Sequence, residues 1–271
     1  LSTRETLIEY KNWNDPDVLT QGTIDFFNQT SGGKVNYTVV DVYEDNSGWP
    51  ALTDGYTYTE EEYLAVLSGQ STPHYPDGVD YNAIVNDPDY DICGKANRGE
   101  IDEVWIYNGP YFGFYESTLV GPGAYWYNSP PVPTPYECNV LVPIMGPNPE
   151  RGLECATENF GHRTESTMTR GYGSWLQNRT SHSWEKFALV DALSPDYSYS
   201  GCGNIHYPPN GTQDYDYANP YTALTNCDDF ENYPNLSDPA SVLEQVTCSA
   251  WDCSHLEYFR YWFGHFPSNS G

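Results

Sequence analysis

The 271-residue chain has few basic side chains: 11 Lys and Arg stand against 38 Asp and Glu, which gives a formal net charge of −27. This shortage excludes nucleic acid as a partner, because phosphate binding needs clustered Lys and Arg. An anionic membrane surface is disfavoured for the same reason. Charged residues make up only 18% of the chain, below the roughly 25% of an average globular protein. The acidity therefore reflects missing bases and not an acidic tail.

The chain also lacks a long apolar run. No stretch reaches the roughly 18 residues that a membrane-spanning helix needs, which predicts no membrane insertion. No signal-peptide pattern opens the chain, so we expect Leu1 to follow a processed or trimmed end. There is no internal repeat or low-complexity linker, and a chain of this length can bury a full core. We therefore predict one compact domain over residues 1–271.

Several catalytic motifs are missing as well. No two cysteines have the C-x-x-C spacing of a zinc ribbon or a thioredoxin. Ser117 and Ser174 have neighbouring glycines, but neither completes the G-x-S-x-G motif of a serine hydrolase. A Ser–His–Asp enzyme is therefore disfavoured, and we predict no nucleotide cofactor.

Cysteines and glycosylation sequons, by contrast, are plentiful. Five Asn-x-Ser/Thr sequons stand at Asn28, Asn36, Asn178, Asn210 and Asn235. Together with seven cysteines and only four lysines they favour a secreted glycoprotein, the alternative being a chance abundance of Asn, Ser and Thr. We expect disulfides among the cysteines from Cys202 to Cys253 to hold C-terminal loops. Seven is an odd number, so we expect either a free thiol at Cys93 or a partner removed with an N-terminal segment.

Periodicity and turn signals predict helices that alternate with strands. We expect helices over 15–31, over 59–67 with a capping-box start, and over about 150–169. We expect strands over 35–43, 101–107 and 141–145. This order predicts an α/β fold with a mostly parallel sheet in residues 1–170. Residues 171–271 should form long disulfide-stapled loops, closed by an amphipathic helix over 251–263.

The loop after the strand at 101–107 is the first candidate site. It runs Asn108-Gly109-Pro110-Tyr111-Phe112-Gly113-Phe114-Tyr115-Glu116-Ser117. Open α/β sheets bind ligands at the carboxyl ends of their strands, where this loop would lie. Glu116 with Asp102 or Glu103 would supply a glycosidase carboxylate pair, and Tyr111, Phe112 and Tyr115 would stack on sugar rings. The alternative is an aromatic-packed loop in which Glu116 caps backbone amides.

The helix at 150–169 carries the second candidate site. Glu158, His162 and Glu165 fall at i, i+4 and i+7, so they share one helix face and could bind a divalent metal, zinc or calcium. His206, in an irregular stretch, could complete the site. The fragment from Glu158 to His162 is similar to the H-E-F-G-H metallopeptidase helix, but Asn159 stands where the general-base Glu would be. The alternative is a face of salt bridges to Arg163 or Arg151.

Basic residues are concentrated near that helix. Five of the eleven lie between residues 151 and 186: Arg151, Arg163, Arg170, Arg179 and Lys186. They either neutralise buried carboxylates or, at Arg163 in particular, hold an anionic group of a substrate.

Five motifs are long enough to be specific: DEVW at 102–105, GPYFGFYES at 109–117, GAYW at 123–126, NSPP at 128–131 and FGHRTES at 160–166. With them the chain resembles a set of uncharacterised secreted bacterial and fungal proteins, from about residue 10 onward. That set has no established activity, so the resemblance implies neither a mechanism nor a site.

Taken together, the sequence favours a secreted, metal-assisted hydrolase that acts on an extracellular polymer, either glycan or peptide. The metal would lower the pKa of a bound water, and Glu116 or Asp102 would supply the base. A metal-free glycoside hydrolase that uses Glu116 with another carboxylate is one alternative. The other is a non-catalytic carbohydrate-binding or surface-structural module whose aromatic side chains stack on glycans.

Overall fold

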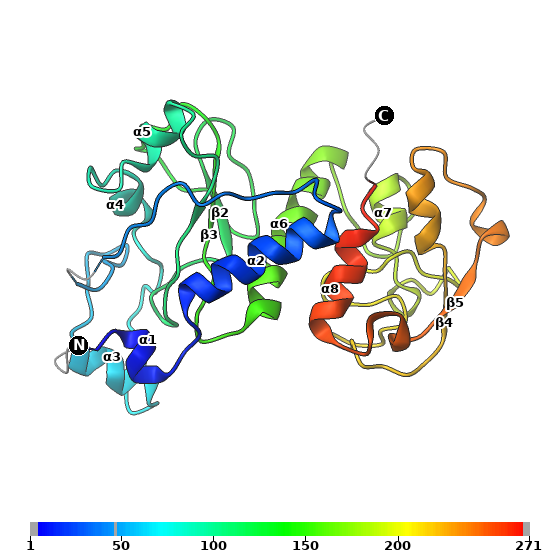
Figure 1. Ribbon diagram of the computed structural model, residues 1–271, viewed down its shortest axis with the longest axis horizontal. Helices are drawn as coiled ribbons and strands as arrows, with labels where there is room; N and C mark the ends of the chain where they lie inside the picture. Colours follow the sequence, from blue (N-terminus) through cyan, green and yellow to red (C-terminus); the bar gives the residue numbers. More distant parts are fainter. Residues whose placement is uncertain (1–4, 46–47, 268–271) are drawn as a thin grey trace. The chain divides into compact units, whose positions relative to one another are not determined.

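The computed structural model describes residues 5–45 and 48–267 (Figure 1). Helix accounts for 34% of the described residues and strand for 7%, so short helices and ordered loops dominate. The α-helices are α1 (Leu7–Lys11), α2 (Pro16–Thr30), α3 (Glu60–Leu67), α4 (Tyr81–Val85), α5 (Ile92–Asn97), α6 (Leu153–Tyr172), α7 (Ser183–Phe187) and α8 (His255–Gly264). The strands are β1 (Val104–Trp105), β2 (Ser117–Val120), β3 (Val142–Met145), β4 (Ala223–Thr225) and β5 (Glu244–Val246). The short 3-10 helices are η1 (Asp191–Leu193), η2 (Cys227–Asn232), η3 (Pro239–Ser241) and η4 (Cys248–Trp251).

The chain divides into two compact units. The first comprises Leu1–Gln21 and Thr38–Arg163, and the second comprises Gly22–Tyr37 and Thr164–Gly271. The prediction of one domain stays a prediction, because this division does not show whether either unit folds alone. Among the described residues, none of the helices is both long enough and apolar enough to cross a bilayer.

Helices with strong local signals form where the sequence predicts them. At the start of α2, the Asp15 carboxylate accepts a hydrogen bond from the amide of Asp17 at 2.8 Å. Helix α3 begins with the predicted capping box, in which Thr59 and Glu62 accept hydrogen bonds from each other's amides. The predicted helix at about 150–169 is confirmed as α6.

The larger sheet departs from the prediction. It has three strands in the order β1-β3-β2, with β1 parallel and β2 antiparallel to β3. The sheet is therefore mixed, and the expected mostly parallel sheet is not seen among the described residues. The strand predicted over 141–145 is confirmed as β3, whereas that over 101–107 shortens to β1.

The strand predicted over 35–43 is wrong. This segment has no strand pairing, and Val39, Val40 and Val42 are 50%, 64% and 67% exposed. β-branched residues favour a strand only when a partner strand and a packed face are present. Here the valines face solvent, so their propensity is not realised.

Two apolar clusters fill the first unit. One includes Val120, Val142 and Ile144 of the sheet, together with the Cys93–Cys138 disulfide. The other comprises Leu52, Tyr58, Tyr63, Val66 and Phe112. The expectation that Cys93 is free is therefore wrong, and the free cysteine is Cys155. The two bonded cysteines are 45 residues apart in the chain, and spacing alone does not reveal such a pairing.

The second unit is built from aromatic side chains and disulfides. Cys202–Cys227 and Cys248–Cys253 confirm the predicted staples of the C-terminal loops. The side chains of Trp184, Trp251, Trp262, Tyr258, Phe230 and Phe259 are almost wholly buried. The final predicted helix forms as α8, preceded by η4.

The sequons differ in accessibility. Asn36, Asn178 and Asn235 are exposed and Asn28 is partly buried. Asn210 is buried, and its amide nitrogen donates hydrogen bonds to the carbonyls of Asn219 at 2.7 Å and Tyr221 at 2.8 Å. In the folded chain Asn210 therefore cannot accept a glycan without losing these bonds.

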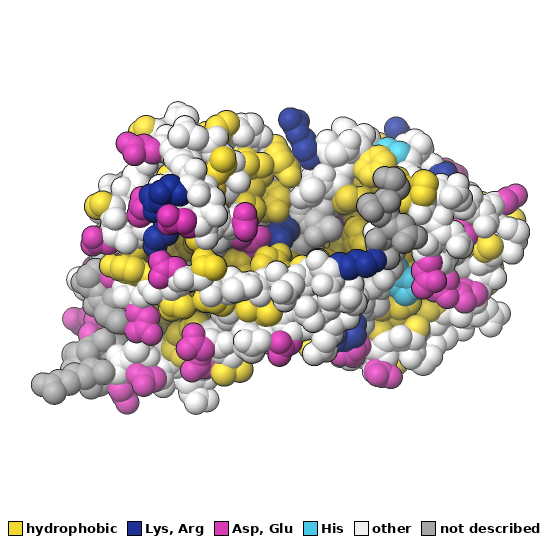
Figure 2. Space-filling model, turned by 45° about the horizontal axis from the view of Figure 1, so that its top comes forward, with side chains coloured by type: hydrophobic (Ala, Val, Ile, Leu, Met, Phe, Trp, Pro, Cys, Tyr) yellow, Lys and Arg dark blue, Asp and Glu magenta, His cyan; other side chains and the backbone are white. Residues whose placement is uncertain are grey.

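The acidic side chains are dispersed. Figure 2 shows Asp and Glu scattered over the visible face, with few Lys or Arg between them. Exposed ion pairs such as Arg98 with Glu100, at 2.7 Å, each contribute only about 0–1 kcal/mol to stability. On this face the negative charge is therefore spread out and not gathered in one patch.

The buried carboxylate of Asp229 is expected to make the stability of the fold fall in acid. Burial alone would raise the pKa of Asp229, but hydrogen bonds from the amide and hydroxyl of Ser237 and from Asn232 lower it below its usual range. The stability that ionised Asp229 contributes is therefore present above the unfolded-state pKa and is lost as the pH falls through the folded-state pKa. We expect Asp229→Asn to lower the unfolding free energy by about 1–3 kcal/mol at pH 7, measured by urea denaturation.

The cost of this substitution should shrink as the pH falls below about 4, where the wild-type carboxylate is also becoming protonated. The exposed Asp252→Asn is the matched control, and it should have little effect at either pH. An equal loss for Asp229→Asn at pH 7 and in acid would contradict the role of its charge.

Candidate functional site

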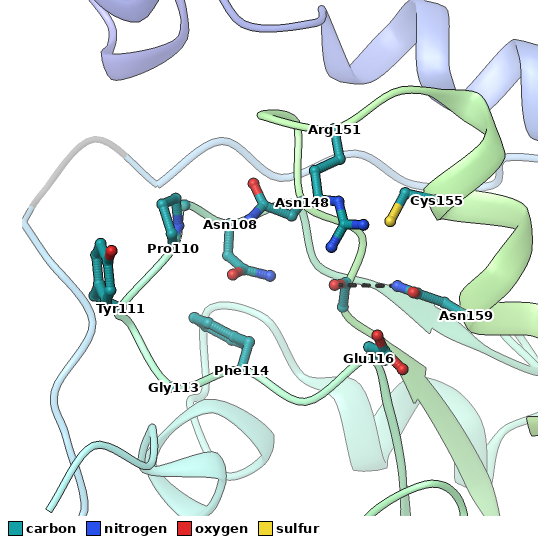
Figure 3. Close-up of a pocket in the computed structure, with 12 residues that line it drawn as sticks. Asn108, Pro110, Tyr111, Gly113, Phe114, Glu116, Asn148, Arg151, Cys155 and Asn159 are labelled. Carbon is teal, nitrogen blue, oxygen red and sulfur yellow. Dashed lines mark hydrogen bonds between the residues drawn. The ribbon is translucent and has the colours of Figure 1, made fainter. Parts of the chain in front are cut away.

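A pocket of about 160 Å³ lies in the first unit at the ends of the sheet strands (Figure 3). Asn108 follows β1, Gly146 and Asn148 follow β3, and Glu116 directly precedes β2. Because β1 and β3 are parallel, their carboxyl ends lie at one edge of the sheet, where α/β folds commonly bind ligands. The loop that the sequence singled out therefore borders a pocket at the expected edge.

The geometry of the loop separates its aromatic residues. Gly113 has φ +76°, and a Cβ there would collide with the carbonyl of Asp77, so only glycine fits this turn. Phe112 turns into the core and stacks on Tyr63, with ring centroids 4.2 Å apart. Tyr111 lines the pocket and is 46% exposed. Tyr115 is also exposed but is not among the lining residues, and it stacks on Tyr81.

Of the three predicted catalytic carboxylates, Glu116 alone lines this pocket. It is half-buried and accepts a hydrogen bond from the Asn128 amide at 2.5 Å. Asp102 is exposed. Glu103 is held by the Arg163 guanidinium at 2.5 Å and by the Trp105 indole N–H at 2.5 Å.

Arg163, predicted to hold substrate, is engaged within the protein. Besides its ion pair with Glu103, its guanidinium lies 4.5 Å from the centre of the Phe160 ring. Phe160 in turn packs edge-on against Trp105 of β1. Arg163 therefore helps to fix α6 against the sheet.

Four further polar residues line the pocket, although none of them was assigned a binding or catalytic role from the sequence: Asn108, Asn148, Cys155 and Asn159. Arg151, which the sequence offered only as a salt-bridge partner, lines the pocket as well. Asn159 donates to the carbonyl of Gly146 at 3.4 Å, and this bond joins α6 to the end of β3 (Figure 3). Their positions in the sequence could have indicated two of these residues, because Asn108 and Asn148 each stand three residues after the end of a strand.

The free thiol in the pocket is not a nucleophile at neutral pH. Burial raises the pKa of Cys155 to about 12, and the nearby carboxylates of Glu158 and Glu116 act in the same direction against Arg151. The thiolate is the reactive form of cysteine. Cys155 therefore remains a protonated thiol, 3.7 Å from the Glu158 carboxylate.

A possible metal-binding group is centred on α6. Glu158 is 2% exposed, and its carboxylate lies 3.7 Å from Nε2 of His162, one helical turn later. With His206, these residues offer three ligand atoms that all lie within 4.8 Å of one another. The group Glu158, His162 and His206 could therefore hold a metal ion, and it includes three of the four residues that the sequence predicted as ligands.

The fourth predicted ligand, Glu165, has a different position. It is buried, and its carboxylate accepts a hydrogen bond from the amide of Ile205 at 2.9 Å. Glu165 thus connects α6 to the residue directly before His206. Its helical spacing from His162 placed it on the correct face, but its contact there is with the backbone.

The loop that carries His206 is fixed by several buried hydrogen bonds. The Tyr258 hydroxyl lies within donor distance of three carbonyls, at 2.7 Å from Asn204, 3.0 Å from Tyr207 and 3.3 Å from Cys202. Gly203 has φ +81°, and a Cβ there would crowd this hydroxyl and the Tyr207 carbonyl. The Asn204 side chain also accepts from the amides of His206 and Tyr207, both at 3.1 Å.

The imidazole of His206 has two neighbours in the second unit. The Tyr215 hydroxyl lies 3.1 Å from Nε2, and the Asp214 carboxylate lies 3.6 Å from Nδ1. Tyr215 has φ +62°, a left-handed conformation that is uncommon for a bulky residue. Such backbone strain persists only where the surrounding structure determines it, and it is concentrated at functional sites.

The chain matches no protein-family model, no curated protein and no solved structure. Its function must therefore be inferred from the geometry of these residues. The resemblance to secreted bacterial and fungal proteins stays a prediction.

The Tyr258 hydroxyl offers a direct test of how the His206 loop is held. Tyr258→Phe keeps the packing but removes the single hydroxyl hydrogen that these carbonyls share, and the loss of one such bond costs about 0.5–1.5 kcal/mol. We expect a loss of this size in urea denaturation and faster amide exchange at residues 203–207. Tyr221→Phe, at a 67% exposed tyrosine, is the control and should change neither. Unchanged exchange in Tyr258→Phe would show that the hydroxyl does not hold the loop.

Proposed function

We propose that Glu158, His162 and His206 bind one zinc ion and that the protein is a metal-assisted hydrolase. The observation that carries this proposal is the set of three ligand atoms within 4.8 Å of one another. Two imidazoles with one carboxylate form a ligand set of catalytic zinc sites, in which water or substrate occupies a fourth position. A structural zinc site would instead be closed by a fourth protein ligand, usually with cysteine among the ligands.

The donor atoms favour zinc over calcium. Calcium takes about 6–8 oxygen ligands, mostly from carboxylates and carbonyls. Imidazole nitrogen suits zinc and other first-row transition metals. Two of the three donors are histidines, and the remaining predicted carboxylate, Glu165, accepts a backbone hydrogen bond.

When bound, zinc would supply a water of lowered pKa and polarise a substrate carbonyl. The chain must supply the base from outside the usual helix position, because Asn159 cannot take a proton. Glu116 is the carboxylate that fits, since it lines the pocket and Asn128 fixes its orientation. Cys155 lines the same pocket and contacts Glu158, so pocket and ligand helix are neighbours.

A metal-free glycosidase is less well supported. Such enzymes place two carboxyl groups on either side of the scissile bond. Among the described residues, Glu116 is the one carboxylate that lines the pocket, with Glu103 paired to Arg163. A single carboxylate in the pocket favours a mechanism in which a metal activates the water and the carboxylate accepts its proton.

The proposed site of action is outside the cell. Three disulfides form in the structure, and disulfides persist chiefly in oxidising compartments. Three exposed sequons support the same assignment. In the extracellular space the protein would have access to the glycan or peptide polymer expected as its substrate.

Metal content tests the ligand set. Wild-type protein, loaded with zinc and dialysed, should retain about one equivalent by mass spectrometric metal analysis. His162→Ala and His206→Ala should lose it, because each removes one of three protein ligands. Glu165→Gln should keep it, since the glutamine oxygen can still accept from Ile205. His74→Ala, at a histidine paired with Asp54 in the first unit, is the control. Zinc retained by both His162→Ala and His206→Ala would overturn the site.

The catalytic base is tested by Glu116→Gln. Loss of a general base lowers kcat by about 10²- to 10⁴-fold, and this variant should still bind zinc because Glu116 is not among the ligands. Turnover would be followed on a panel of ester, amide and glycoside substrates before and after chelation. Glu137→Gln, at an exposed glutamate outside the pocket, serves as control. Full turnover after chelation would refute the metal-assisted mechanism, and full turnover in Glu116→Gln would refute the base.

A further inference from the structure

The pocket at the carboxyl ends of β1 and β3 contains polar atoms that the protein itself does not use. Each of three asparagines uses one end of its side-chain amide in a hydrogen bond to the backbone. Asn108 donates to the Ile106 carbonyl, Asn159 donates to the Gly146 carbonyl, and Asn148 accepts from the Glu150 amide. Among the described residues, the other end of each amide has no protein partner. This leaves two carbonyl acceptors, on Asn108 and Asn159, the NH₂ group of Asn148 as a donor, and the second N–H of each of the other two amides.

The charged lining residues follow the same pattern. Asn128 occupies one oxygen of Glu116, and the other oxygen has no hydrogen bond among the described residues. The Arg151 guanidinium forms no ion pair with any described residue, although the chain has 38 acidic side chains. Figure 3 shows Arg151, Asn108, Asn148, Asn159 and Glu116 arranged around one space. Acceptors and donors are thus interleaved around it.

The charge of the lining points to an uncharged ligand. The positive charge of Arg151 and the negative charge of Glu116 cancel within the pocket, whereas the whole chain has a net charge of −27. An anionic polymer would be repelled by the surface around the pocket. A cation would meet the Arg151 guanidinium. A neutral group that both donates and accepts hydrogen bonds matches the lining, and the sugar hydroxyl has this property.

Shape adds a second constraint. The pocket, about 160 Å³, is smaller than the roughly 300–1,000 Å³ of sites for drug-sized ligands, so it suits one ring. Tyr111 and Phe114 also line it, and aromatic rings pack well against apolar surface while their polar neighbours fix orientation. A peptide would instead need an exposed strand edge or a groove for several residues.

We propose that this pocket binds one uncharged sugar ring of a glycan. Resting on the function proposed above, the substrate is then a neutral polysaccharide that bears ester or amide groups, because a zinc site acts at a carbonyl. In the reaction, the oxygen of water bonds to the acyl carbon and the bond from that carbon to the sugar oxygen or nitrogen breaks. Glu116 takes the proton from water and returns it to the leaving group, so a carboxylic acid and a free hydroxyl or amine result.

Binding is tested first, on an array of neutral glycans, uronate glycans and peptides, with the intact chain. We expect selective binding to neutral glycans. For the best neutral oligosaccharide, calorimetric titration should show affinity lowered at least about tenfold in Arg151→Gln and in Asn108→Ala, since each loses hydrogen bonds to the ligand. The matched controls are Arg179→Gln and Asn139→Ala, both at exposed positions outside the pocket, and they should bind like the wild type.

The outcomes separate this inference from the proposed hydrolase. The sugar pocket is overturned if the protein binds only uronate glycans or peptides, or if it binds nothing on the array. It is also overturned if both Arg151→Gln and Asn108→Ala bind the oligosaccharide with unchanged affinity. His162→Ala and chelated protein should bind the sugar as before, because the pocket needs no metal. Release of acetate from an acetylated neutral glycan, lost in His162→Ala, supports the substrate class. Sugar binding without such release retains the pocket and rejects the hydrolase.

Discussion

The hydrogen bond between the Glu165 carboxylate and the Ile205 amide is the contact on which the candidate metal site depends. It fixes the residue before His206 to the same helix that carries Glu158 and His162. A buried carboxylate is costly unless it is hydrogen-bonded, and here the bond to the amide offsets part of that cost.

That loop is held far more firmly than its irregular sequence indicates. Tyr258 and Trp262 both donate from α8 to its carbonyls, and the Asn204 side chain organises it from within. Burial raises the pKa of Tyr258 well above its usual value, so the hydroxyl remains a donor throughout the accessible pH range. Ordering a loop costs backbone entropy of about 1–2 kcal/mol per residue. The many buried hydrogen bonds of this loop offset that entropy cost, and their effect is to hold the His206 imidazole in a defined position.

Local signals in the sequence were sufficient for the four α-helices of eight or more residues, but not for the shorter helices, the order of the sheet, the partner of Cys93 or the pocket. The Thr59–Glu62 capping box and the helical face of Glu158 and His162 depend on neighbours in the chain, so both could be predicted. The partner of Cys93, the fate of the strand at 35–43 and the role of Glu165 depend on residues far away in the sequence. The pocket asparagines, Asn108 and Asn148, were missed because asparagine after a strand is also an ordinary turn residue.

Asn159 stands where the similar metallopeptidase motif has a general-base glutamate, and its contact in the structure gives this asparagine a different use. At that helix position the Asn159 amide donates to Gly146 at the end of β3, so the residue joins sheet and helix. A carboxylate there would instead face a carbonyl oxygen and be repelled by it. The base can therefore come from the sheet, at Glu116, where Asn128 donates to it and Arg151 lines the same space. In the proposed hydrolase, a base on the sheet would leave the helix to hold the metal and would place the proton acceptor among the groups proposed to bind the substrate.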